Sequence, residues 1–127
     1  FDQIKNISKH IELIKKAMFK VVNEARGTAN YSLINLQLLN KSDKYLFSGK
    51  TGTSQVKRIT ISERESEDFR KKEIEWKDKD HALFVGYMPS INPKYAVSVV
   101  IEHGGSGAKV AAPIAKRIFD YIHELKI

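Results

Sequence analysis

Cysteine is absent from this chain of 127 residues, which excludes a disulfide scaffold and thiolate metal sites. The length suits one ordinary domain that buries a core without disulfides. No apolar run approaches the roughly 18 residues of a membrane-spanning helix, and no basic segment followed by an apolar stretch marks a signal peptide at Phe1. An initiator methionine is also lacking, so we expect that any membrane anchor would lie upstream of these residues.

Histidine is scarce, and the four residues His10, His81, His103 and His123 show none of the paired spacings of metal sites. We therefore expect no metal site and no cofactor. His81 and His103 fall at the ends of predicted strands, where hydrogen bonding is a commoner role than catalysis.

A net charge of +7 raises the question of a nucleic-acid partner. Most of the excess lies in residues 1–50, which carry 9 basic and 4 acidic side chains, and many of these lysines belong to the polar face of a predicted helix. Aromatic residues are not interleaved with basic ones, as single-strand binding would favour. We predict no nucleic-acid binding, and a basic binding module stays an alternative.

Apolar residues recur at steps of three and four near both ends of the chain, which predicts two amphipathic helices. The first spans about residues 8–25 and ends at Gly27, and the second spans about residues 109–125, with Pro113 in its first turn. Their apolar stripes are Ile7, Ile11, Ile14, Met18, Val21 and Ala25, and Val110, Ala111, Ile114, Ile118, Tyr121, Ile122 and Leu125.

Three segments between these helices are predicted strands, at residues 45–56, 81–88 and 95–102. The last two are joined by Pro-Ser-Ile-Asn-Pro at residues 89–93, which is typical of a hairpin loop. Apolar residues on both faces of the middle strand predict that it is buried on both sides, between helical layers. The predicted fold class is α+β, with a three-strand antiparallel meander packed against N- and C-terminal helices.

Two further segments show no clear period. Residues 57–80 hold 16 charged side chains, so we expect a long solvated excursion with a short helix around residues 63–73. A connection of that length is usually functional or mobile. Its single tryptophan, Trp76, is expected to anchor it locally. Residues 28–44 are expected to be irregular.

The first predicted strand carries the tetrad Lys50-Thr51-Gly52-Thr53. A glycine inside a strand leaves room for a ligand to come close, and the flanking hydroxyls and ammonium are donors that suit a carboxylate. The tetrad therefore predicts a site that holds an extended anionic substrate.

The surroundings of the tetrad resemble a known family. Lys50-Thr51-Gly52 matches the third motif of the serine acyl-transferases that include penicillin-binding proteins, whose set is S-x-x-K, S-x-N or S-D-N, and K-T-G. The sequence F-S-G-K-T-G-T-S-Q-V resembles the K-T-G-T-x-Q-V strand of class B penicillin-binding proteins. The similarity continues through H-A-L-F-V-G-Y-M-P, N-P-K-Y-A-V-S-V-V and E-H-G-G-S-G, and it is closer to the elongation type, penicillin-binding protein 2, than to the division type.

This resemblance implies that residues 1–127 are the C-terminal portion of a penicillin-binding transpeptidase domain, with the weakest match over residues 57–80. Such a domain belongs to a serine D,D-transpeptidase that cross-links peptidoglycan, acts on stem peptides ending in D-Ala-D-Ala and is acylated by β-lactams. Its sheet has five strands, two of them from sequence before Phe1, with the K-T-G strand at one edge.

The resemblance also implies a role for each member of the tetrad. Lys50 contributes positive potential and hydrogen-bonds toward the serine of an S-x-N motif. The hydroxyls of Thr51 and Thr53 bind the carboxylate of the substrate or β-lactam, and Gly52 lets the acyl chain lie flat against the strand. The backbone N–H of Thr53 supplies one oxyanion donor, and the nucleophilic serine supplies the other.

We expect no nucleophile in this chain, because in the family S-x-x-K precedes K-T-G, and none of the 49 residues before Lys50 offers it. From 10 serines and 17 lysines, about one S-x-x-K match arises by chance. Motif-like matches downstream of the tetrad are residues 54–57, 106–109 and 90–92. The chain alone is therefore expected to be inactive. The alternative is a self-contained small serine hydrolase with Ser106 as nucleophile and Lys109 as base.

The expected partners are the N-terminal part of the domain, the peptidoglycan stem peptide, β-lactams and, by resemblance, cell-wall elongation proteins. The expected location is the periplasmic face of the bacterial inner membrane, through an N-terminal anchor. Without its neighbouring strands, the segment from Tyr95 to Glu102 would be an unpaired apolar edge, so we predict self-association along it.

Overall fold

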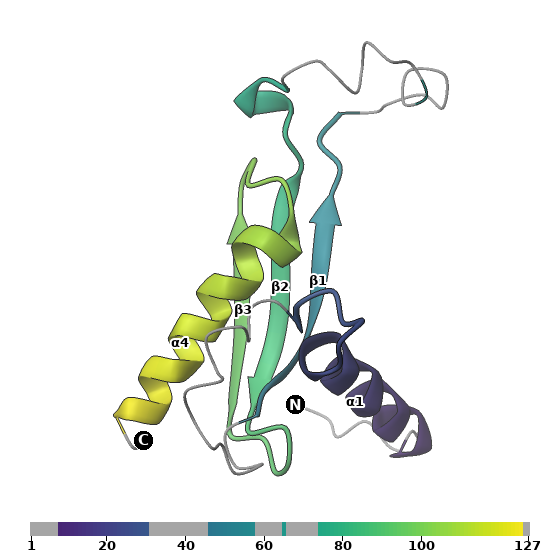
Figure 1. Ribbon diagram of the computed structural model, residues 1–127, viewed down its shortest axis with the longest axis vertical. Helices are drawn as coiled ribbons and strands as arrows, with labels where there is room; N and C mark the ends of the chain where they lie inside the picture. The colour runs from purple at the N-terminus through teal and green to yellow at the C-terminus, as the bar shows by residue number, and fades with distance from the viewer. Residues whose placement is uncertain (1–7, 31–45, 58–64, 66–73, 126–127) are drawn as a thin grey trace, which may run out of the picture.

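The computed structural model describes residues 8–30, 46–57, 65 and 74–125. In these ranges the sheet has three strands. Figure 1 shows them side by side, with one helix lying along the sheet and another beside the first strand. Both strand pairs are antiparallel and follow the order of the chain, so the predicted α+β class and the meander are confirmed. The elements are α1 (Ser8–Asn23), β1 (Ser48–Ser54), β2 (His81–Met88), β3 (Tyr95–Ile101) and α4 (Ala112–Glu124).

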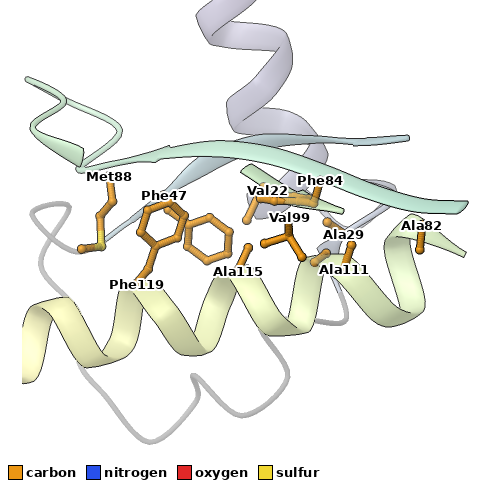
Figure 2. Close-up of a cluster of buried hydrophobic side chains, with 11 residues drawn as sticks. Val22, Ala29, Phe47, Ala82, Phe84, Met88, Val99, Ala111, Ala115 and Phe119 are labelled. Carbon is orange, nitrogen blue, oxygen red and sulfur yellow. The ribbon is translucent and has the colours of Figure 1, made fainter. Parts of the chain in front are cut away.

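The strand register sorts the side chains onto two faces of the sheet. Phe84 stands opposite Thr51 on β1 and Val99 on β3, whereas its neighbour Val85 stands opposite Lys50. Successive side chains of a strand point to opposite faces, so these two rows lie on opposite sides. We call the side of Phe84 the helix-covered face, because α4 runs along it (Figure 2), and the side of Val85 the open face.

A cluster of buried apolar side chains fills the space between α4 and the helix-covered face (Figure 2). The ring centroids of Phe47 and Phe119 lie 5.1 Å apart, and Phe47 meets Phe84 edge-on at 6.3 Å. Fully burying a side chain of this size stabilises the fold by about 1.5–3 kcal/mol. The cluster consists of Val22, Ala29, Phe47, Ala82, Phe84, Met88, Val99, Ala111, Ala112, Ala115 and Phe119.

Phe84 occupies space that two glycines leave free. Gly49 and Gly86 stand opposite each other on β1 and β2. A Cβ on Gly49 would lie 2.1 Å from Cζ of Phe84, and one on Gly86 would lie 2.7 Å from its Cε1. The ring of Phe84 therefore lies over the backbone of both strands, where it is fully buried.

The end of α1 is fixed by close backbone contacts. The N–H of Ala29 donates to the carbonyl of Val21 at 3.0 Å, and a Cβ on Gly27 would lie 2.3 Å from the same carbonyl oxygen. A glycine is therefore needed where the sequence predicted the helix to end, although the regular helix stops at Asn23. Val22 and Ala29 are fully buried in the cluster described above.

The C-terminal helix begins with a π turn, Gly107–Ala111, and continues as α4, with Pro113 in the first turn as predicted. Ser106 caps the π turn, since its Oγ accepts a hydrogen bond from the N–H of Lys109 at 3.3 Å. Pro113 stands in the first turn of the α-helix, where proline is tolerated.

Two strands are shorter than predicted. β1 ends at Ser54 rather than Val56, because the N–H of Val56 donates to a side chain, Asp80 Oδ1, instead of the ladder. β3 ends at Ile101 rather than Glu102, because the chain turns there and His103 adopts a φ of 53°.

The prediction that β2 is buried on both faces is wrong for the described residues. Phe84 and Met88 on the helix-covered face are buried, whereas Val85 on the open face is 48% exposed. Leu83 and Tyr87, also on the open face, are only half-buried. The reason is that α4 and the end of α1 both contribute to the cluster on the helix-covered face, and no described helix covers the other.

Some expectations fall on residues outside the described ranges. The irregular segment at residues 28–44 is described only up to residue 30. Of the short helix expected around residues 63–73, only Glu65 is described, and it is helical. The excursion is described again from residue 74, where Trp76–Asp78 form a 3-10 turn. Nowhere in the described ranges is a helix both long and apolar enough to cross a membrane.

Candidate functional site

The tetrad Lys50-Thr51-Gly52-Thr53 lies on β1, at one edge of the sheet (Figure 1). One side of β1 pairs with β2 along its whole length. In the described part of the chain no strand pairs with its other side. An extended chain can bind at such an edge, because main-chain donors and acceptors face outward there.

Lys50 presents its side chain on the open face, where it is exposed. Its Nζ donates to the carbonyl oxygen of Thr51 at 2.6 Å. Among the described residues no carboxylate pairs with this ammonium group, so its charge is available to an anionic ligand.

Thr51 lies on the helix-covered face and is held by a residue that follows α1. Its Oγ1 lies 2.9 Å from Oγ1 of Thr28. A hydroxyl has one proton and two lone pairs, so this bond leaves Thr51 two hydrogen-bonding positions, which include its proton when Thr28 is the donor. The sequence pattern did not single out Thr28, because it lies in a segment without a clear period.

Asn23 makes a second link between α1 and the tetrad strand. Its Nδ2 donates to the carbonyl of Phe47 at 3.0 Å, just before β1, and to the carbonyl of Phe19 at 2.9 Å. The end of α1 therefore holds β1 through Asn23 on one side of the glycine Gly49 and through Thr28 on the other. This residue too was missed, since a polar residue at a helix end has many ordinary uses.

Gly52 is approached closely by other parts of the chain. A Cβ on Gly52 would lie 3.2 Å from Cβ of Leu83, and a Cβ on Gly107 would lie 2.1 Å from the carbonyl oxygen of Gly52. The start of the C-terminal helix thus rests on the backbone of the tetrad. The sequence predicted that Gly52 lets a ligand come close to this strand. The structure shows that Gly107 comes close to it.

Thr53 is the exposed hydroxyl of the tetrad. Within the described ranges its side chain has no hydrogen-bond partner, unlike that of Thr51. Lys50 offers an ammonium group on the open face, and Thr53, in the same row as Thr51, offers a hydroxyl on the helix-covered face. Each of these groups suits a carboxylate.

Two of the three serines in the motif-like downstream matches, Ser106 and Ser90, have structural partners. The Oγ of Ser106 accepts a hydrogen bond from the backbone N–H of Lys109. A nucleophile with a lysine base would instead direct its Oγ at the ammonium group of that lysine. The Oγ of Ser90 lies 2.8 Å from Oγ of Ser48, at the opposite end of β1 from Thr53.

Three rings gather where β1 leaves the sheet. The centroid of His103 lies 4.5 Å from that of Trp76 and 4.8 Å from that of His81. The N–H of His103 donates to Nδ1 of His81 at 2.9 Å, and Nδ1 of His103 lies 3.1 Å from the carbonyl oxygen of Lys79. Both histidines therefore make the strand-end hydrogen bonds that the sequence favoured. Trp76 stacks locally as expected, although its side chain stays 65% exposed.

No group of three or more histidine, aspartate or glutamate side chains in the described ranges could hold a metal ion. An α+β fold that carries K-T-G-T on an edge strand, under the start of a C-terminal helix, defines the class of penicillin-recognising serine acyl-transferases.

The comparison with family models is more specific. Residues 3–120 match the penicillin binding protein transpeptidase domain. The chain belongs to this family, and within it the relatives that it matches are of the penicillin-binding protein 2 type. The resemblance drawn from the sequence is thereby confirmed.

Two curated relatives are named peptidoglycan D,D-transpeptidase MrdA. The protein from Haemophilus influenzae is 36% identical over 110 residues, which are 87% of this chain and 15% of the relative. The protein from Escherichia coli K12 is 31% identical over 111 residues, which are 87% of this chain and 16% of the relative. The chain thus spans only about one sixth of the length of the relatives it matches.

Solved structures give the same assignment. Penicillin-binding protein 2 of Helicobacter pylori, in complex with MreC, matches 92% of this chain with a TM-score of 0.67 and 26% identity, and the match covers 18% of that chain. Penicillin-binding protein 2 of Pseudomonas aeruginosa, in complex with WCK 5153, matches 94% with a TM-score of 0.62 and 34% identity, and the match covers 20% of that chain.

Proposed function

We propose that this chain supplies the substrate-binding wall of a serine D,D-transpeptidase, an enzyme that cross-links peptidoglycan and is acylated by β-lactams. The observation that supports this most directly is the position of K-T-G-T on an edge strand that no described strand covers. An acyl donor ending in D-Ala-D-Ala is an extended peptide with a free carboxylate, so it matches both the open edge and the exposed donors.

In this proposal Lys50 supplies positive potential on the open face and hydrogen-bonds toward the serine of an S-x-N motif. Thr53 binds the substrate carboxylate through its free hydroxyl. Thr51 assists through the hydrogen-bonding positions that its hydroxyl keeps beside the bond to Thr28. Gly52 lets the acyl chain lie against the strand. The N–H of Thr53 is one of two oxyanion donors, and removing a single such donor typically slows acyl transfer by about 10²–10³-fold.

The second oxyanion donor and the nucleophile belong to an S-x-x-K serine outside these 127 residues. Half of an oxyanion hole without a nucleophile gives no covalent chemistry. The chain alone is therefore inactive, and penicillin does not acylate it. Ser106 is not a substitute, because its Oγ caps the helix start.

A labelling experiment with two proteins tests this proposal. The 127-residue chain and the polypeptide encoded by its complete reading frame are incubated with a fluorescent penicillin and then measured by intact mass. We expect one acyl adduct on the longer protein and none on the chain. An adduct on Ser106 or Ser54 of the chain would instead favour the small hydrolase. A longer protein that takes up no label would contradict the proposed function.

The location and partners follow from the same assignment. We place the enzyme at the periplasmic face of the inner membrane, where its substrate is, with an N-terminal anchor. Because the Helicobacter pylori relative forms a complex with MreC, we further propose that this enzyme works with proteins of cell-wall elongation. Fractionation of cells that express the complete reading frame tests the location, and label in the cytosolic fraction would contradict it.

The free edge of β3 gives the isolated chain a way to associate. In the described residues β3 pairs only with β2, and Val100 is 57% exposed. Unpaired apolar edges invite pairing with another chain, so we propose that two copies associate along the strand from Tyr95 to Glu102. Sedimentation at rising concentration tests this, with Val100→Lys expected to reduce association and a monomer at all concentrations contradicting it.

A further inference from the structure

β1 leaves the sheet directly after the tetrad, and the backbone of its continuation is held by the side chain of Asp80. The last ladder pair joins Ser54 to His81. Two residues beyond it, the N–H of Val56 donates to Oδ1 of Asp80 at 3.3 Å. Asp80 immediately precedes β2, so its carboxylate extends the contact between β1 and β2 past the end of the ladder.

Asp80 also joins this point to the connection between β3 and α4. Its carbonyl oxygen accepts a hydrogen bond from the N–H of Gly105 at 2.7 Å. Gly105 has a φ of 80°, a left-handed conformation that glycine adopts without strain. The same connection leads through Ser106 to Gly107, which rests on the carbonyl of Gly52.

The residues on either side of Asp80 are themselves fixed. The carbonyl of Lys79 lies 3.1 Å from Nδ1 of His103, and Nδ1 of His81 accepts the N–H of His103 at 2.9 Å. The ring of Trp76 stacks on His103 from the same segment. Because its neighbours are held, the carboxylate of Asp80 has a defined place beside β1.

Thr53 consequently lies between two fixed points, Gly52 beneath Gly107 on one side and Val56 beside Asp80 on the other. We infer that Asp80 is a positioning residue that sets the place of Thr53 for substrate. This inference rests on the proposed function, since Thr53 is the residue that binds the carboxylate and donates to the oxyanion there. Asp80 itself acts through the backbone of Val56 and need not touch the substrate.

The physical reason is that a reacting group must be held within a fraction of an ångström. Misplacing substrate-positioning groups by about 1 Å can cost about 10²-fold in rate. A partly exposed hydrogen bond, in contrast, adds only about 0.5–1.5 kcal/mol to stability. Loss of the Asp80 carboxylate should therefore reduce acylation much more than it reduces folding.

Three variants of the complete reading-frame protein test the inference by the kinetics of acylation with a fluorescent penicillin. Asp80→Ala removes the acceptor, and we expect the second-order acylation rate constant to fall at least about tenfold. Asp80→Asn keeps an oxygen that can accept from Val56, so we expect it to stay within about threefold of the wild type. The matched control is Asp78→Ala, which removes a side-chain ion pair with Lys57, N–O 3.3 Å, and keeps the bond between Asp80 and the Val56 backbone.

Further readouts separate positioning from a structural role. In Asp80→Ala we expect a lower rate constant at saturating penicillin and a higher half-saturating concentration, because Thr53 donates to the oxyanion and also binds the carboxylate, while the thermal midpoint stays nearly unchanged. Acylation by Asp80→Ala at the wild-type rate would overturn the inference, as would equal losses in the alanine and asparagine variants.

Val56→Pro gives a second route, because it removes the donor instead of the acceptor. We expect the same loss of acylation, and adding Asp80→Ala should then cause less than about a twofold further change, since both act on one bond. If Asp80→Ala does not fold, the acylation rate of Val56→Pro is the test on its own. Acylation of Val56→Pro at the wild-type rate would overturn the inference.

Hydrogen exchange measured on the 127-residue chain tests this inference separately from the proposed function. If the complete protein takes up no penicillin, the proposed function fails, and the bond itself is still measurable. We expect the Val56 amide to exchange faster in Asp80→Ala than in the wild type or Asp80→Asn. Unchanged exchange in Asp80→Ala would show that Asp80 does not hold the strand.

Discussion

Gly107 and Gly52 are in backbone contact: a Cβ on Gly107 would stand 2.1 Å from the carbonyl oxygen of Gly52. The start of the C-terminal helix therefore rests on the strand that carries the tetrad. The same helix continues into the core through Ala115 and Phe119. The position of the tetrad is thus coupled to the packing of the last helix.

Replacing Gly107 by alanine should destabilise the chain. The added methyl group cannot be accommodated unless the helix start moves away from β1 and β2, and overpacking of this kind typically costs about 1–3 kcal/mol. We expect Gly107→Ala to lower the free energy of unfolding in urea by this amount. Lys109→Ala, at an exposed position of the same turn, should stay within about 0.5 kcal/mol of the wild type. Equal stability of the two variants would contradict the contact.

The two glycines of β1 should respond differently to alanine. A Cβ on Gly49 would lie 2.1 Å from the ring of Phe84, whereas one on Gly52 would lie 3.2 Å from Cβ of Leu83. We therefore expect Gly49→Ala to lower the free energy of unfolding by about 1–3 kcal/mol and Gly52→Ala by less. Urea denaturation of both variants checks the order, and the reverse order would contradict the placement of Phe84.

The elements with strong local patterns could be predicted from the sequence. The bounds of β2 agree with the predicted ones because apolar and aromatic residues run through Leu83, Phe84, Val85 and Tyr87, and turn residues follow the strand. The tetrad was found because its residue types are unusual for a strand. Both signals lie within a few consecutive residues.

Features that depend on distant contacts could not be predicted in this way. Thr28, Asn23 and Asp80 each hold β1 through a partner more than twenty residues away, and nothing in their neighbours indicates that partner. The error on β2 has a related cause. An apolar residue such as Val85 predicts burial, but only the placement of the helices decides which face they cover.

The hydrogen bond between Thr28 and Thr51 should be measurable as a coupling energy. Replacing either residue by valine removes one hydroxyl of a pair whose oxygens lie 2.9 Å apart. We expect a double-mutant cycle on the free energy of unfolding to give a coupling of about 0.5–1.5 kcal/mol. The same cycle with Thr28 and Thr53 should give none, because in the described structure Thr53 makes no hydrogen bond with Thr28.

Ser106 distinguishes a structural serine from a nucleophile. Its Oγ accepts the N–H of Lys109, and replacing such a cap by alanine typically costs about 0.5–2 kcal/mol. We expect Ser106→Ala to lower the free energy of unfolding by this amount, and Ser106→Asn, which keeps a capping oxygen, to retain most of the stability. In the complete reading-frame protein, both variants should take up penicillin to the same final extent as the wild type. Loss of the adduct in Ser106→Ala, with its thermal midpoint above the assay temperature, would instead identify Ser106 as the nucleophile.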